Sequence, residues 1–562
     1  MFASALIGTQ ACVANGGADS STDASDADQP DVDPDTDAPG DDFGEDVTGS
    51  GGGGGGGDGD NPATCEQATA SRSYIGCEFW PTVTYNPVYD LFEFAVVLAN
   101  GGEADATVTV TGPNSVNITE TVPAGQLKAI TLPWVSALKG PAFPASTTAG
   151  SAMRSQTSVR VNGGAYKVVS SVPVTAWQFN PLPYRKPGTS ACQGTIFSGN
   201  TDCFSVSNDA SLLMPATAMT GNYRVFSRSG GVTTGSFGSA PGGVAITATQ
   251  DGTTVKVKYA AGCVGSGGFC VTASGDIAAG NAGDIASFSM NAGDVIELVG
   301  AVSKDGGSVA ADMSGSLVQA DKPIQAIGLN PLANVPSDGT GNADHLEEAL
   351  LPAEVLGKEY IVAPPTAVDG VVRGGHLVRI YGNVAGTTLT YDVKPAGAPD
   401  AIGEGEVVEF TTDAAFRVTG DQPFAVGSFM LGGQLQSNSA SCPDYECPGD
   451  PAFSLEVTPE QFRTKYTFLA PTDYDKNFAD VLVPDGAVVT LDGAPLGGTA
   501  TPIGAIGWSV VRVPLTGTDG SHKLESDKPV GLQVMGFGHA TAYYYPGGLN
   551  LKLISPPPPA VN

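Results

Sequence analysis

The sequence predicts an all-β protein made of about four tandem β-sandwich-like modules, which follow a disordered acidic and glycine-rich N-terminal tether. Two observations predict the β class. The chain has 76 Gly and 41 Pro with only 15% charged residues, and its apolar residues occur in Thr/Val-rich runs. Such a composition is typical of short strands joined by turns. A third observation, a short phrase that occurs four times, predicts the internal repeats.

The repeated phrase has a polar residue two places before a proline and an apolar run after it. Its copies are centred on Pro173, Pro323, Pro423 and Pro529, and the last is the clearest, Asp527-Lys528-Pro529-Val530-Gly531-Leu532-Gln533-Val534. The polar residue can accept backbone hydrogen bonds that open a turn, and proline fixes φ at the second turn position. The apolar run is typical of a strand buried on both faces. Each copy therefore predicts a tight turn into a core strand.

Length and charge limit the classes of function. A chain of 562 residues has room for three to five domains. With a net charge of −32 and only 26 Lys and Arg, it lacks the basic residues that phosphate contacts require. We therefore expect no nucleic-acid partner, and we interpret the acidity as a property that keeps an exported protein soluble.

The N-terminal residues 1–12 predict an export signal. Met1–Ala11 is short and weakly apolar and ends at Cys12. This order resembles the end of a bacterial lipoprotein signal, in which the cysteine receives the lipid, although no basic residue precedes the apolar run and Thr9 stands where Leu is usual. We favour lipidation of Cys12, and a plain secretory peptide is the alternative. Because no other stretch is apolar enough to span a bilayer, a lipid on Cys12 would be the only membrane anchor.

The composition of residues 13–64 predicts a disordered tether. They are rich in Asp, have no basic residue between Asp19 and Asp60, and include seven consecutive glycines from Gly51 to Gly57. Such a segment cannot bury a core and is extended by its own charge.

The remaining eight cysteines fall into four close pairs, and we expect a disulfide within each: Cys65 with Cys77, Cys192 with Cys203, Cys263 with Cys270, and Cys442 with Cys447. Disulfides indicate an oxidising compartment outside the cytoplasm. Zinc is the rival for the last pair, but no CxxC knuckle and no His pair accompany it.

The repeats divide the folded part into modules at residues 65–190, 191–337, 338–437 and 438–552, with a proline-rich tail at 553–562. Residues 91–99 form an apolar strand of the first module, and residues 106–111 alternate with period two. In each later module a proline is followed seven or eight residues on by a tyrosine that begins a strand: Pro215 and Tyr223, Pro352 and Tyr360, Pro459 and Tyr466.

Two groups of residues are candidates for ligand binding. Asp473, Asp475, Asn477 and Asp480 present oxygen atoms at close spacing, as a calcium loop does, but Pro484 stands where such a loop has its last Glu. Calcium is therefore possible, and otherwise we expect no cofactor or metal. The aromatic run Tyr543-Tyr544-Tyr545 is either a stacking surface for a sugar or a protein, or the core of the last strand.

No catalytic residue can be assigned. The chain has no nucleophile elbow, phosphate-binding loop or zinc-protease motif. Asp344, His345, Glu347 and Glu348 lie together before the third module, where paired carboxylates could serve glycoside hydrolysis. We expect instead that they belong to a solvated loop between modules.

The repeated phrases also carry a resemblance to a known family. Residues 172–179, 321–329 and 416–426, together with Leu350-Leu351-Pro352 and Tyr360, resemble bacterial members of the IgGFc-binding protein N-terminal domain family, over residues 72 to 550. The resemblance implies a non-enzymatic lipoprotein of the bacterial cell envelope, anchored in the outer membrane, that binds a protein or a glycan. It supplies no ligand-contacting residues. A structural spacer without a specific ligand is the alternative.

Overall fold

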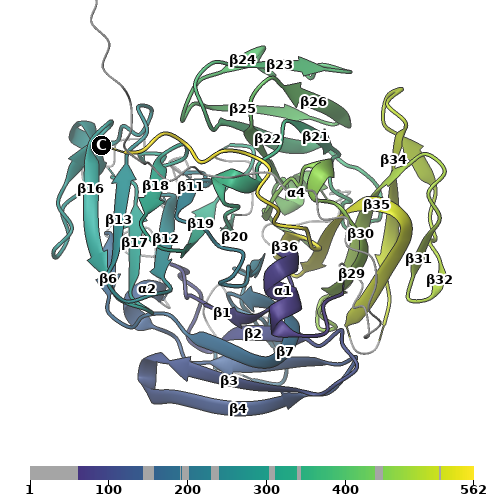
Figure 1. The fold of residues 1–562 in the computed structure, drawn as a ribbon, viewed down its shortest axis with the longest axis horizontal. Helices are drawn as coiled ribbons and strands as arrows, with labels where there is room; N and C mark the ends of the chain where they lie inside the picture. The colour runs from purple at the N-terminus through teal and green to yellow at the C-terminus, as the bar shows by residue number, and fades with distance from the viewer. Residues whose placement is uncertain are drawn as a thin grey trace, which may run out of the picture. The chain divides into compact units, whose positions relative to one another are not determined.

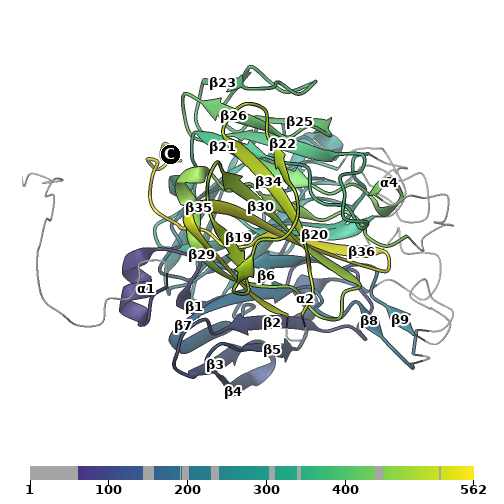
Figure 2. The same cartoon turned by 90° about the vertical axis from the view of Figure 1, so that its right-hand side faces the viewer.

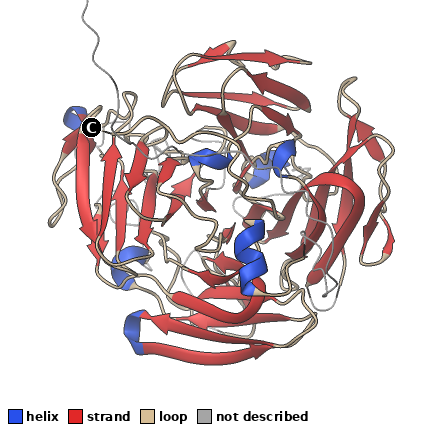
Figure 3. Cartoon of the chain, in the orientation of Figure 1, coloured by secondary structure: helices blue, strands red, loops and turns tan. Residues whose placement is uncertain are grey.

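The computed structural model describes residues 61–142, 157–189, 191–192, 202–229, 240–302, 310–337, 343–436, 447–517 and 520–561. The predicted lipidation residue Cys12 and nearly all of the predicted tether therefore lie outside the described residues. Strands dominate the described chain (Figure 3), which confirms the all-β class. No helix in these ranges is long and apolar enough to cross a membrane.

Four modules follow one another along the chain, and we define them by the sheets that their strands form. On this definition the last strands of modules 1, 2 and 3 end at Leu212, Ala349 and Leu455, beyond the expected limits at 190, 337 and 437. Module 1 contains α1 (Cys65–Ser71), β1 (Gly76–Phe79), β2 (Phe94–Ala99), β3 (Ala106–Gly112), η1 (Pro113–Ser115), β4 (Val116–Val122), β5 (Leu127–Leu132), α2 (Ser136–Lys139), β6 (Val159–Val161), β7 (Lys167–Phe179), the hairpin of β8 (Arg185–Lys186) and β9 (Cys203–Phe204), and β10 (Ala210–Leu212). Module 2 contains β11 (Asn222–Arg224), β12 (Gly243–Ala248), β13 (Thr253–Lys258), η2 (Ser266–Gly268), β14 (Phe269–Val271), β15 (Gly280–Asn281), β16 (Ile285–Met290), β17 (Val295–Val299), β18 (Leu317–Ala320), β19 (Ile324–Ala333) and β20 (Asp344–Ala349).

Module 3 contains η3 (Ala353–Val355), β21 (Glu359–Val362), β22 (His376–Gly382), β23 (Thr387–Tyr391), β24 (Ala401–Ile402), β25 (Val407–Thr412), β26 (Phe416–Gly420), β27 (Phe424–Phe429), α4 (Gly433–Gln436) and β28 (Phe453–Leu455). Module 4 contains η5 (Pro459–Gln461), β29 (Arg463–Leu469), β30 (Lys476–Pro484), β31 (Val489–Leu491), β32 (Ala494–Pro495), β33 (Ala500–Pro502), β34 (Trp508–Leu515), β35 (Ser521–Gly538) and β36 (Thr541–Pro546).

Each module has an outer and an inner antiparallel sheet with the same strand order. The outer sheets are β1-β7-β3-β4, β11-β18-β13-β16, β21-β26-β23-β24 and β29-β35-β31-β32. The inner sheets are β5-β2-β7-β10, β17-β12-β19-β20, β25-β22-β27-β28 and β34-β30-β35-β36. This repeated topology confirms the sandwich-like modules. Module 1 also donates β6 to the edge strand β17 of module 2.

The repeated phrase marks the corner at which the chain passes from the outer to the inner sheet. After each proline the strand is buried, as predicted. The predicted tight turn is found only as a two-residue bend before Pro323 and Pro423. At Pro173 and Pro529 the strand continues unbroken through both sheets, as β7 and β35. Proline is tolerated there because a strand that changes sheets bends at the corner.

A buried tyrosine fixes this corner in modules 2, 3 and 4. The hydroxyls of Tyr223 and Tyr360 donate to the carbonyl of the residue after the phrase proline, Ile324 at 2.8 Å and Phe424 at 2.7 Å, and Tyr466 contacts Val530 in the same way. Each hydroxyl also accepts the backbone N–H three residues before it. Each of these tyrosines thus connects the first outer strand of its module to the inner strand that follows the phrase proline.

The last strands of the four inner sheets contact one another, and Figure 1 shows two of them, β20 and β36, near the centre of the molecule. Strands β10, β20, β28 and β36 contact one another in that cyclic order. Each of these strands pairs in the same register with the strand that follows the phrase proline. The residue four places after that proline pairs with Leu212 in module 1, Ala349 in module 2, Leu455 in module 3 and Pro546 in module 4. Side chains of modules 1 and 4 pack together there, with the rings of Trp177 and Tyr545 6.2 Å apart.

In modules 1 and 3 the segment after the first strand contacts the inner sheet of the next module. In module 1, Thr82 contacts Thr247 of β12 at 2.8 Å. In module 3, the hydroxyl of Thr366 donates to Asp480 of β30 at 2.5 Å. These polar contacts connect sheets whose apolar residues already share continuous cores.

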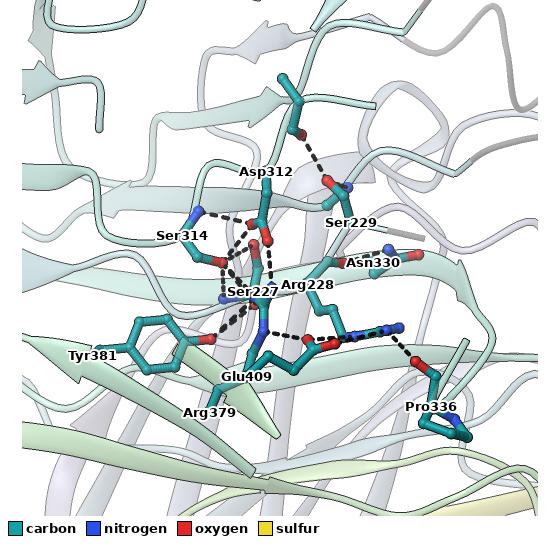
Figure 4. A network of polar contacts seen from close by, with 12 residues as sticks. Ser227, Arg228, Ser229, Asp312, Ser314, Asn330, Pro336, Arg379, Tyr381 and Glu409 are labelled. Carbon is teal, nitrogen blue, oxygen red and sulfur yellow. Dashed lines mark hydrogen bonds and ion pairs between the residues drawn. The ribbon is translucent and has the colours of Figure 1, made fainter. Parts of the chain in front are cut away.

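The contact between modules 2 and 3 is a network of charges (Figure 4). Arg379 of β22 donates to Glu409 at 2.8 Å and to Asp312 at 2.6 Å, and Arg228 of module 2 donates to the same Glu409 at 2.9 Å. Although burial acts to raise it, the two guanidinium groups hold the pKa of Glu409 below its ordinary value. Sequence reasoning did not predict this network, because its bonded pairs are 30, 67 and 181 residues apart.

The two ends of the described chain meet between modules 1 and 4. The backbone N–H of Tyr74 donates to Leu549, that of Leu551 donates to Arg72, and Ser73 pairs with Asn550. Beyond them the tail runs over modules 2 and 3 (Figures 1 and 2), where the N–H of Val561 donates to Gln319 at 2.5 Å. The modules from residue 57 onward belong to one compact unit.

Candidate binding site

An open polar pocket lies in module 4, where the segment 470–477 leaves β29 and enters β30. Backbone hydrogen bonds from Ala470 to Gly520 and from Asp475 to Phe537 hold the segment at both ends. The pocket has a volume of about 230 Å³. Its polar lining includes Thr472, Asp475, Lys476, Asn477, Thr516 and His522.

His522 is held in one orientation at the start of β35. Its Nδ1 lies 2.7 Å from Asp492 Oδ2, and its ring stacks on Phe468 with centroids 5.4 Å apart. Because the carboxylate accepts a hydrogen bond, we assign the proton to Nδ1. A Cβ atom added to Gly517 would lie 3.8 Å from Nε2, so Nε2 faces the side of the pocket that Gly517 leaves open.

Asp475 connects the pocket to module 1. The hydroxyl of the buried Tyr184 donates to Asp475 Oδ1 at 2.7 Å. Burial and then the Asp475 carboxylate raise the pKa of Tyr184 above its ordinary value, so the phenol remains a donor. The Tyr184 ring also contacts Tyr474, at 5.2 Å, and Phe204 of β9, at 6.4 Å.

The half-buried Phe204 extends this surface onto the hairpin of β8 and β9. Its ring lies 4.2 Å from that of His539, and the guanidinium of Arg185 lies 6.0 Å above it. Arg185 also donates to Asp202 at 2.8 Å. The Cys192–Cys203 disulfide closes the hairpin. Phe204 is connected to the pocket residue Asp475 through the buried Tyr184. We call Arg185, Phe204, His539 and the pocket together the module 1/4 face.

The four calcium candidates do not converge on one point. Asp475 accepts from Tyr184, Asn477 accepts from Tyr543 at 2.8 Å, and Asp480 accepts from Thr366, while Asp473 is exposed. In the described ranges no group of three or more His, Cys, Asp or Glu residues is arranged to hold a metal ion. The close spacing of these residues in the sequence does not bring their oxygen atoms together, because β30 begins at Lys476 and carries Asp480 to the interface with module 3.

Of the two alternatives for Tyr543, Tyr544 and Tyr545, the structure shows the strand core and not the stacking surface. All three are at most 1% exposed in the central strand β36. They form the core of the last strand, because the neighbouring central strands cover both faces of β36.

The expectation of a solvated loop at Asp344, His345, Glu347 and Glu348 is wrong. These residues form the central strand β20 and are at most 1% exposed. Glu347 is satisfied by Thr84 at 2.7 Å, Asn180 at 3.1 Å and Gln178 at 3.1 Å. Burial, followed by the charge of Asp209, raises the pKa of Glu348 well above its ordinary value.

This acidic centre does not resemble a hydrolase site. Burial and then Asp450 raise the pKa of Asp344, and burial raises that of Asp450. The group is enclosed by the four inner sheets, and its interactions are those of a polar core that joins modules.

Three of the expected cysteine pairs are disulfides in the structure, Cys65–Cys77, Cys192–Cys203 and Cys263–Cys270. Cys447 is disulfide-bonded too, while its expected partner Cys442 lies outside the described residues.

Sequence reasoning did not identify the residues that shape the module 1/4 face. Tyr184 and Phe204 belong to one hairpin, whereas His522 is more than 300 residues further along the chain, and none of the three belongs to a motif. The close Cys192 and Cys203 pair was the one signal, since it indicated a stiffened loop with aromatic and basic residues beside it.

Comparisons with known proteins place this architecture in a family. The family model described as IgGFc binding protein matches residues 209–536, from the start of β10 into β35 and more than half of the chain. The chain belongs to the IgGFc binding protein family. The match confirms the family resemblance inferred from the repeated phrases.

The other comparisons add little. The comparison with curated proteins found no match to this chain. Among solved structures, a GH78 family rhamnosidase of Bacillus sp. GL1 aligns with 10% identity and a TM-score of 0.12, over 70% of this chain and 56% of that one. The chain thus spans little more than half of that enzyme, and a likeness this weak carries no argument.

Proposed function

We propose that this protein is a non-enzymatic recognition protein that binds a protein partner through the module 1/4 face. The family points to immunoglobulin Fc as the first partner to test. The observation that carries the proposal is the contact of Tyr184 with both Phe204 and Asp475, which joins a disulfide-closed hairpin with aromatic rings to an open polar pocket.

The chemistry of the face suits recognition. Arginine and aromatic residues contribute much of the binding energy at protein interfaces. Arg185 is exposed and Phe204 half-buried, and both lie on the paired strands β8 and β9, beside the Cys192–Cys203 disulfide. A preorganised surface loses less conformational entropy when it binds, so modest contacts give useful affinity.

We further propose that the protein is exported to the bacterial cell envelope and anchored in the outer membrane by lipid on Cys12. The three described disulfides support an oxidising compartment. The acidic segment that precedes the modules would project the face away from the membrane.

Surface plasmon resonance with the full chain tests the recognition function. Purified immunoglobulin Fc should bind, and Arg185→Ala should weaken binding by about tenfold, as loss of an interface arginine does. Arg417→Ala is the matched control, because Arg417 is a similarly exposed arginine in module 3. Fc that does not bind, or binds both variants equally, would contradict the proposal, and the spacer function would then replace it.

A further inference from the structure

We propose that the module 4 pocket binds one neutral pyranose ring, such as a terminal sugar of a glycan. This inference rests on the proposed function, because the pocket lies within the module 1/4 face, and it names a ligand for that face.

The size of the pocket favours a small ligand. Sites for drug-sized molecules have volumes of roughly 300–1,000 Å³, whereas this pocket has about 230 Å³. It is open on one side, where Thr472, Thr516 and Gly517 are exposed. One sugar ring can therefore enter while the rest of a glycan stays outside.

The charges of the lining favour a neutral ligand. Asp475 and Lys476 contribute one negative and one positive group. The net charge of −32 on the chain disfavours the approach of an anion. A neutral molecule is repelled neither by Asp475 or Lys476 in the lining nor by the net charge of the chain.

The hydrogen-bonding groups match a polyol. The Asp475 carboxylate accepts, the Lys476 ammonium donates, and the hydroxyls of Thr472 and Thr516 can do both. Sugar hydroxyls also donate and accept, so they can pair with every one of these groups. Ala470, Tyr474 and Leu515 supply an apolar part of the wall for the C–H groups of a ring.

Two of the polar groups are already oriented. Tyr184 fixes one oxygen of Asp475, and Asp492 fixes the imidazole of His522 with Nε2 toward Gly517. Because these side chains are ordered before the ligand arrives, little rotamer entropy is lost on binding. A single ring can then bind with measurable affinity.

Saturation-transfer NMR and calorimetry on the full chain test the site. The probes are the methyl glycosides of glucose, galactose, mannose, N-acetylglucosamine and fucose. At least one should bind with a millimolar Kd. Gly517→Leu should reduce its affinity at least tenfold, because the new side chain would stand beside His522 Nε2 without a backbone clash. Thr472→Ala should reduce it about fivefold through loss of one hydrogen bond.

Gly497→Leu is the matched control, because Gly497 is an exposed glycine of module 4 with open space around it, and it should bind the sugar as the wild type does. The inference is overturned if no glycoside binds, or if Gly517→Leu and Thr472→Ala bind as tightly as Gly497→Leu. Fc binding by the same variants separates the two proposals. A silent glycoside panel with Fc binding that still depends on Arg185 would refute the sugar site alone.

Discussion

The carboxyl group of Glu456 is enclosed between modules 3 and 4. Ser428 donates to it at 2.6 Å, and the same Ser428 hydroxyl lies 3.0 Å from His376 Nδ1. Burial raises the pKa of Glu456 to about 7. In the unfolded chain the group ionises near pH 4.5, so the folded state holds the proton over a wider range. The stability that this proton provides is complete below about pH 4.5 and is lost as the pH rises to about 7.

Glu456→Gln should remove this loss. Between pH 4.5 and 7.5 the wild type should lose about 3 kcal/mol of unfolding free energy relative to the variant. Urea unfolding across this range measures it. Glu460→Gln, an exposed neighbour, controls for the loss of one carboxylate. A pH-independent difference between Glu456→Gln and wild type would show that Glu456 does not titrate as inferred.

At the scale of the elements, a buried tyrosine holds the corner between the outer and the inner sheet. The buried hydroxyl of Tyr360 accepts a hydrogen bond from the N–H of Gly357 and donates one to the carbonyl of Phe424. Tyr360→Phe leaves both groups unpaired, and we expect a loss of about 2–4 kcal/mol in unfolding free energy. Tyr391→Phe in the same module removes one half-buried bond to Pro399 and should cost about 1 kcal/mol. Equal midpoints of thermal unfolding for the two variants would contradict this role of the corner.

At the scale of the whole molecule, the meeting of the chain ends joins module 4 to module 1. Leu551 is fully buried there, whereas Leu553 is 54% exposed. Leu551→Ala should cost about 2–5 kcal/mol and speed hydrogen exchange of the Tyr74 amide, which donates to Leu549. Leu553→Ala should change the stability by no more than about 0.5 kcal/mol. If the Tyr74 amide exchanges at the same rate in both variants, the chain ends do not hold the modules together.

The sequence alone determined the repeats, the β class and the positions of the buried strands after each phrase. These features are local: a proline at a bend and a run of apolar residues specify a buried strand wherever the strand is placed. The close cysteine pairs were local in the same sense, because short loops keep both partners near each other.

Only the tertiary structure decided which face each strand presents and which loops meet. Glu347, Tyr543 and Asp344 have residue types that occur both in loops and in cores, and they are buried because four inner strands pack together at the centre. The module 1/4 face likewise joins Tyr184 of module 1 to Asp475 of module 4, which approach each other only when the fourth module packs against the first. Neither arrangement leaves a periodic signal, because the contacts depend on packing between modules and not on the order of residues within one strand.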